Sequence, residues 1–145
     1  MATTYASIFD AFLDEITDPE MLLLSEDLRE DYLTALMNKA ITRCSRVCSN
    51  VDLVSRNDDT GTFDEDIPAE VIEIIVAWML VFWLQPYVNN LENLQNRLST
   101  KDFTVFSPAN LLEKMSAWYE ICRHNARRLM NHYSYIISDV SELQS

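Results

Sequence analysis

Three cysteines and one histidine are the side chains best suited to hold a metal ion, because thiolates and imidazoles are the usual zinc ligands. They are Cys44, Cys48, Cys122 and His124. Cys44 and Cys48 are spaced to share one helix face, but the Cys-Arg-His run at 122–124 is not a usual ligand spacing. The cysteines also fall on apolar stripes, where a free cysteine acts as a small hydrophobic residue. The sequence therefore predicts reduced thiols in a cytosolic setting, and neither a metal nor another cofactor.

The acidic stretch at residues 57–61, Asn-Asp-Asp-Thr-Gly, suggests calcium. An EF-hand loop has glycine at its sixth position, oxygen ligands at the first, third and fifth positions, and glutamate at the twelfth. Aligning Gly61 with the sixth position puts Arg56 first and Ile67 twelfth. Neither side chain supplies a carboxylate, so the sequence predicts a solvated acidic loop here.

Two histidines on the last predicted helix are the remaining candidates for acid–base catalysis. His124 and His132 lie near Arg123, Arg127 and Arg128, and no triad includes them, whereas a general base needs a partner that orients it. An enzyme with its site in the core of the fold would need a buried ionisable residue, for which Glu73 is the one good candidate. A single buried carboxylate more often lies at a rim or pairs with an arginine. The sequence therefore predicts that the protein is not an enzyme.

The composition favours helices around these residues. The chain has 145 residues, and 48% of them are hydrophobic, which is enough for the core of one domain. A single glycine leaves little for phosphate-binding loops or tight hairpins. The formal net charge of -12 argues against binding to nucleic acid backbone or anionic lipid. We expect an all-α fold, a single compact bundle of four to five helices that spans residues 1–145.

Apolar residues at helical spacing locate the helices of this bundle. We expect them over residues 5–16, 26–48, 67–84, 87–98 and 108–135. Ser25 and Ser107 supply the N-cap hydroxyls of two of them, and Pro86 kinks or restarts another. Residues 49–66 are predicted to be a flexible acidic loop, and residues 136–145 a frayed tail.

The segment from 71 to 84 is the most apolar, with thirteen apolar residues in fourteen. A membrane span needs about 20, so we expect a buried helix and no membrane contact. Its aromatic residues, Trp78, Phe82 and Trp83, leave two interpretations open. The helix is either central in its own bundle or half-buried by a partner subunit.

Two groups of cations lie on the predicted helices. Those of the 26–48 helix, at positions 39, 43 and 46, follow its acidic start and complement the helix dipole. Those of the last helix are Arg123, Arg127 and Arg128. These three either pair with acidic faces of the same chain or contact a neighbouring copy in an oligomer, and the sequence favours neither.

Four short motifs carry a resemblance to a known family. They are the runs FDEDIPAE at 63–70, WLQP at 83–86, STKDF at 99–103 and FSPANL at 106–111. With these motifs in this order, the chain resembles small virion structural proteins of the neck, or head–tail connector, of tailed bacteriophages. The resemblance covers roughly residues 60 to 135. It departs from many such adaptors because it lacks a clear glycine-rich or strand-forming insertion loop.

The resemblance implies a helical adaptor without catalytic residues. Such a protein forms a homo-oligomeric ring of about twelve copies beneath the portal protein and joins the capsid to a further neck or tail protein. It belongs to the virion and assembles in the cytoplasm of the host bacterium. The subunit interface would then use Trp78, Phe82 and Trp83 together with the three arginines.

An acidic wall would suit such a ring, because repulsion keeps the passing DNA from sticking. The candidates are Asp58, Asp59, Asp64, Glu65 and Asp66. The alternative function is a small acidic inhibitor or DNA mimic that acts on a host DNA-binding enzyme. A mimic should array carboxylates regularly over one face, whereas here they cluster in one predicted helix start and one loop. No sequence-specific nucleic acid binding is expected.

Overall fold

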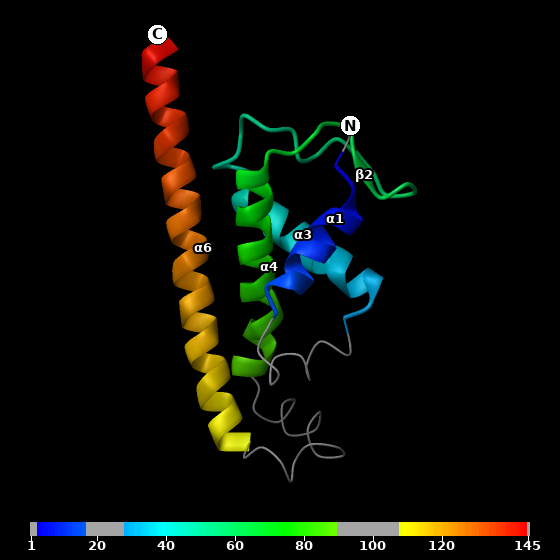
Figure 1. The fold of residues 1–145 in the computed structure, drawn as a ribbon, viewed down its shortest axis with the longest axis vertical. Coiled ribbons are helices and arrows are strands. Elements are labelled where there is room, and N and C mark those ends of the chain that lie inside the picture. The colour runs from blue at the N-terminus through cyan, green and yellow to red at the C-terminus, as the bar shows by residue number, and fades with distance from the viewer. Residues whose placement is uncertain (1–2, 17–27, 90–107, 145) are drawn as a thin grey trace.

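The computed structural model describes residues 3–16, 28–89 and 108–144. These residues contain four helices and one small hairpin, which confirms the predicted all-α fold (Figure 1). The elements are α1 (Tyr5–Asp14), α3 (Glu30–Cys44), β1 (Arg56–Asn57), β2 (Thr62–Phe63), α4 (Ala69–Asn89) and α6 (Pro108–Gln144). The predicted caps Ser25 and Ser107 and the predicted stripe beyond residue 89 lie outside the described residues.

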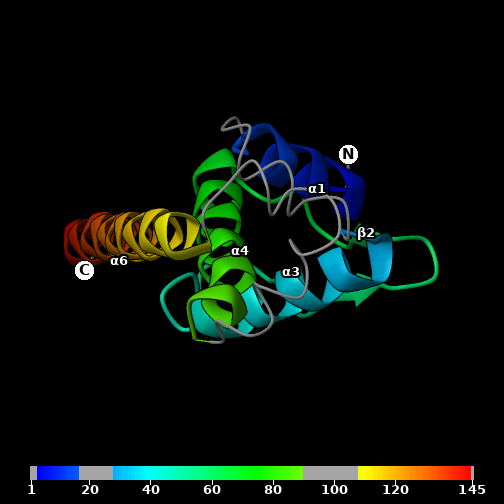
Figure 2. The ribbon, with the colours of Figure 1, turned by 90° about the horizontal axis from the view of Figure 1, so that it is seen from below.

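Helix α4 is the centre of the fold. Each of α1, α3 and α6 packs against it, and α1 and α3 both extend on the side of it away from α6 (Figure 2). Most of its length is buried because it is apolar nearly all round. By length and composition it is also apolar enough to cross a membrane, but 56% of its window from Ala69 to Pro86 is buried inside the protein. The helix continues through Pro86, which lies in its last turn.

Helix α1 follows the predicted stripe. The Thr4 hydroxyl accepts a hydrogen bond from the Ser7 backbone N–H and caps the helix. Ile8 and Phe12 are fully buried, whereas the apolar side chain of Leu13 is 39% exposed. The buried face of α1 is therefore narrower than its apolar stripe.

Helix α3 begins at Glu30 and ends at Cys44. It is therefore shorter than the helix predicted over residues 26–48. Its buried face includes Met37, which is fully buried, whereas Tyr32 is 39% exposed.

The prediction of a flexible loop over residues 49–66 is wrong for residues 56–63, which form an antiparallel hairpin. Arg56 pairs with Phe63, and Asn57 with Thr62. The Asn57 side chain accepts hydrogen bonds from two backbone N–H groups of the turn, and Gly61 adopts φ +66°. An asparagine that caps its own turn and one glycine in the left-handed region are sufficient for a tight reversal.

The start of the chain pairs with this hairpin. The Phe63 N–H donates to the Thr3 carbonyl at 2.9 Å, and the Tyr5 N–H donates to the Gly61 carbonyl at 2.8 Å. The Thr3 hydroxyl accepts from the Ile67 N–H at 2.7 Å. These bonds hold the hairpin against the N-terminal end of α1.

Helix α6 has 37 residues and is therefore about 55 Å long. It continues to Gln144, so the predicted end near Tyr135 is wrong, and residues 136–144 of the predicted frayed tail are helical. Neither glycine nor proline follows Pro108, so nothing in the sequence stops the helix. α6 lies along α4 at one side of the molecule (Figure 1), with Met115, Ala126 and Tyr133 buried.

Candidate interaction surfaces

The cysteines lie in or beside the core. Cys44 and Cys48 are fully buried, and the neighbouring Cys48 side chain together with burial raises the pKa of the Cys44 thiol. Burial, with a smaller contribution from the charge of Glu15, raises the pKa of the half-buried Cys122 to about 11. Within the described ranges, no group of three or more Cys, His, Asp or Glu side chains is placed to hold a metal ion.

Glu73, the candidate for a buried catalytic carboxylate, is exposed. It lies at the rim of a cavity of 290 Å³ between α1, α4 and α6, with Leu80 and Leu129 in the lining. The apolar residues on either side of Glu73 in the sequence face the core, and the carboxylate points away from it. The requirement for a buried ionisable group is not met at this position.

Two of the three aromatic residues predicted for the subunit interface are core residues instead. Trp83 is fully buried with its ring 5.8 Å from that of Phe12, and Trp78 is 2% exposed. The Arg43 guanidinium lies 4.9 Å from the Trp78 ring. Phe82 is half-buried and stacks on Trp78 at 5.9 Å. Of this group, only Phe82 reaches the surface, because α1, α3 and α6 surround the rest of α4.

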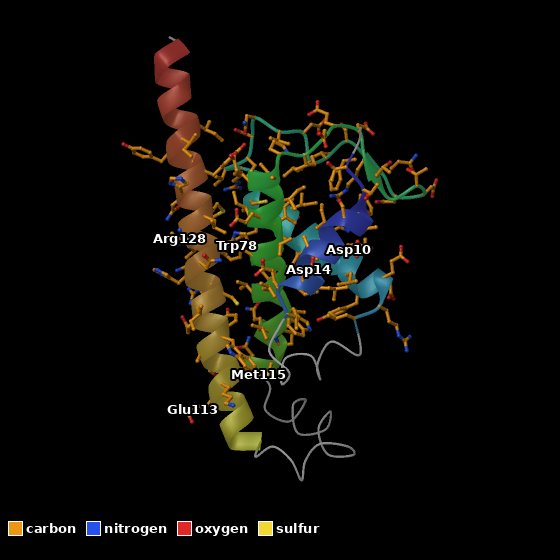
Figure 3. All side chains as sticks on the ribbon, in the orientation of Figure 1. Asp10, Asp14, Trp78, Glu113, Met115 and Arg128 are labelled. Atoms are coloured by element: carbon orange, nitrogen blue, oxygen red, sulfur yellow. The ribbon has the colours of Figure 1, made fainter. Side chains whose placement is uncertain are left out.

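The three interface arginines lie at the surface of α6. Arg127 and Arg128 are exposed, and Arg128 donates to the Asn125 side chain at 2.8 Å. Arg123 lies 4.0 Å from Glu120, one turn earlier in the same helix. Figure 3 shows Arg128 on the opposite side of α4 from Asp10 and Asp14 of α1. Their contact with another copy stays a prediction.

An apolar stripe on α6 is the surface feature that the sequence did not reveal. Ile121 is 66% exposed and Tyr135 is 68% exposed. Together with Arg128 they have heptad spacing, so they follow one line along the helix. Ile136, 43% exposed, lies beside this line. The spacing was visible in the sequence, but only the exposed fractions show that no described residue covers Ile121 and Tyr135.

The five carboxylates of the predicted acidic wall are all exposed, but only two of them form side-chain hydrogen bonds within the described part of the chain. Asp58 accepts a hydrogen bond from the Tyr5 hydroxyl at 2.7 Å, and Asp66 accepts one from the Thr3 hydroxyl at 3.0 Å. These two carboxylates help to hold the hairpin on the start of the chain. No hydrogen bond or ion pair to a described side chain engages the carboxylates of Asp59, Asp64 or Glu65.

We expect the Tyr5 hydroxyl to titrate unusually late. Burial and the hydrogen bond to Asp58 raise the pKa of Tyr5 from 10.0 to about 12. Because the folded protein keeps this proton more tightly than the unfolded chain does, its contribution to stability is complete below pH 10 and is lost as the pH rises toward 12.

The absorbance of ionised tyrosine measures this titration. One of the six tyrosines should ionise near pH 12 in the folded wild-type protein, and that step should be missing from Tyr5→Phe. Tyr135→Phe, which removes an exposed hydroxyl, is the matched control and should leave the late step in place. A wild-type titration curve without a late step would contradict the hydrogen bond.

Two grooves flank the contact between α4 and α6. The first, the α1–α6 groove, includes the cavity beside Glu73 and a neighbouring hollow of 750 Å³ that shares Glu15, Leu80 and Asn125 with it. The second, the α3–α6 groove, has a volume of 700 Å³ and includes Lys39, Arg43, Arg46, Val47, Phe82 and Met130. One groove thus carries carboxylates, and the other carries cations and apolar side chains.

Comparison with protein-family models, with curated proteins and with solved structures gives no match. The function must therefore be argued from these surfaces and from the resemblance of the sequence motifs.

Proposed function

We propose that the protein is a structural adaptor in the neck of a tailed bacteriophage. In this role it forms a ring with copies of itself, binds the portal protein on one side and a further neck or tail protein on the other, and lets DNA pass. It acts by contact rather than catalysis, in the virion, after assembly in the host cytoplasm.

The exposed stripe on α6 is the observation that carries this proposal. Helix α6 packs on α4 and leaves Ile121 and Tyr135 about two-thirds exposed, so these two apolar side chains have no cover among the described residues. Isolated exposed apolar residues are ordinary, but a line of them along a helix is typical of a binding surface. Arg128 between them adds a cation that a carboxylate of the partner can pair with.

The charge of the protein supports the proposed DNA passage. Each copy carries a formal charge of -12, so a closed ring presents a strongly negative surface that repels DNA. Asp59, Asp64 and Glu65 on or beside the hairpin are exposed and are the carboxylates that we propose for the wall. Asp58 and Asp66 contribute charge to it while they also hold the hairpin in place.

Light scattering coupled to size exclusion tests the proposal at two protein concentrations, with and without the purified portal ring of the same phage. We expect a closed high-order species, or a monomer that assembles on the portal. A monomer that ignores the portal and instead inhibits a host DNA-binding enzyme would refute the adaptor and support the DNA mimic.

The double variant Ile121→Glu/Tyr135→Glu tests the stripe. Each substitution puts a carboxylate where an apolar side chain is proposed to meet a partner, so binding to the portal ring or to the next neck protein should weaken by about tenfold or more. Asn131→Glu adds a carboxylate to α6 at an exposed position that is already polar, and it should bind normally. If the wild type, the double variant and Asn131→Glu all bound equally well, the stripe would not be the binding surface.

A further inference from the structure

The α3–α6 groove gathers three cations from α3 and the turn after it. Lys39, Arg43 and Arg46 are spaced i, i+4 and i+7, so they follow one face of α3 and the turn after it. On α6, Arg123 and Arg127 share a helix face with Met130, which lines the groove. Lys39 and Arg46 form no ion pair with any side chain of the described residues. A protein of charge -12 thus concentrates unpaired positive charge at one place.

The same groove has an apolar base. Val47, Phe82 and Met130 are only partly buried, although all three pack against the core. The Asn38 Oδ1 atom at this groove is buried and accepts no hydrogen bond from the described residues. Buried acceptors are rarely left without a donor. The groove is therefore suited to an element that brings both apolar surface and negative charge.

The outer face of α1 has these properties. Asp10, Leu13 and Asp14 are spaced i, i+3 and i+4, so they share one face. Both carboxylates are exposed, and Leu13 between them is 39% exposed. The two aspartates are one turn apart, about 6 Å along the helix, and Lys39 and Arg46 are seven residues apart, about 10 Å. Their long flexible side chains can span that difference. Helix α1 thus offers a short amphipathic ridge that complements the groove in charge and in polarity.

We infer that α1 of one copy docks in the α3–α6 groove of a second copy, with Asp10 and Asp14 facing Lys39 and Arg46 and with Leu13 against Phe82. Helix α1 contributes no residue to this groove, so a copy can use both surfaces at once. Such a contact is head-to-tail, and repetition of it gives a ring when the rotation closes. The inference rests on the proposed function, since it names the lateral contact of the proposed ring.

A pair of charge-reversal variants tests the contact. The groove variant is Lys39→Glu/Arg46→Glu, and the ridge variant is Asp10→Lys/Asp14→Lys. Arg43 is kept because it covers the Trp78 ring. Each variant alone places like charges face to face, so its self-association should weaken by about tenfold or more. In an equimolar mixture the acidic groove meets the basic ridge, and the wild-type groove meets the wild-type ridge, so assembly should return.

Sedimentation velocity measures assembly of each variant and of the mixture, alone and on the portal ring. Arg46→Glu and Arg29→Glu form a matched pair, because both exchange an exposed arginine of the α3 region but only Arg46 lines the groove. Only Arg46→Glu should weaken assembly. Thermal unfolding of each variant at low concentration verifies that it folds.

The failures of the two proposals differ in appearance. Suppose first that the wild type assembles. If either charge-reversal variant then assembles to the same extent, or if the mixture of the two folded variants does not assemble, the docking of α1 is wrong and the adaptor remains. If the wild type stays monomeric both alone and with the portal ring, the adaptor and the docking fail together.

Discussion

Trp83→Ala is expected to lower the free energy of unfolding by about 3–5 kcal/mol, the usual cost of removing a fully buried large aromatic side chain. Trp83 is 0% exposed, and its ring meets that of Phe12 edge to face at 5.8 Å. The substitution opens a cavity between α1 and α4. Because the net stability of a domain is only about 5–15 kcal/mol, the loss is a large fraction of the total. Urea unfolding at low protein concentration measures it from the shift of the midpoint.

Trp83→Phe is the matched control. It keeps a ring against Phe12 and removes an indole N–H that is buried and finds no acceptor in the described part of the chain. We therefore expect a much smaller loss than for alanine, since an unpaired buried donor itself costs free energy. A Trp83→Ala protein of normal stability that fails to assemble would instead place this side chain at a subunit interface and contradict its burial.

Phe63→Ala is expected to cost about 3 kcal/mol and to loosen the start of the chain. Phe63 is 1% exposed and meets the Tyr5 ring at 5.2 Å with an interplanar angle of 65°. Its backbone N–H donates to Thr3, so the side chain and the backbone tie the same two segments together. Urea unfolding gives the global loss, and hydrogen exchange at the Tyr5 and Phe63 amides gives the local one.

Asp59→Ala changes the turn of the same hairpin without touching the core. Asp59 is exposed, and only its backbone N–H is bonded within the turn. Its cost should stay within about 0.5 kcal/mol. If Phe63→Ala were equally mild, the hairpin would be an independent loop, as the sequence alone had suggested.

The helices were predictable because their apolar residues repeat with a strong period. The run from 71 to 84 has thirteen apolar residues in fourteen, so burial of this helix was predictable, although the sequence left open whether its own bundle or a partner subunit covers it. The hairpin was missed because one glycine in 145 residues argues against tight turns, whereas a single Gly61 at φ +66° with Asn57 before it is sufficient. The end of α6 was missed because its last residues lose their apolar period but contain no residue that stops a helix.

The surfaces were less predictable than the helices, because they depend on which elements become neighbours. The aromatic residues of α4 fitted either a core or an interface, and only the helices around α4 make Trp78 and Trp83 core residues. The cations at 39, 43 and 46 are explained locally by the helix dipole. Their position in one groove with Phe82 of α4 and Met130 of α6 is a tertiary feature, which periodicity within one helix does not contain.

The pairing of the first residues with the hairpin also sets the order in which the chain can fold during synthesis. Residues 3–5 find their backbone partners at 61–65, and α1 and α3 find their packing surface only on α4. A nascent chain that ends before α4 therefore cannot form the hydrophobic core, even if some of its helices form transiently. Domains generally fold as units, and here that unit is incomplete until α4 has left the ribosome.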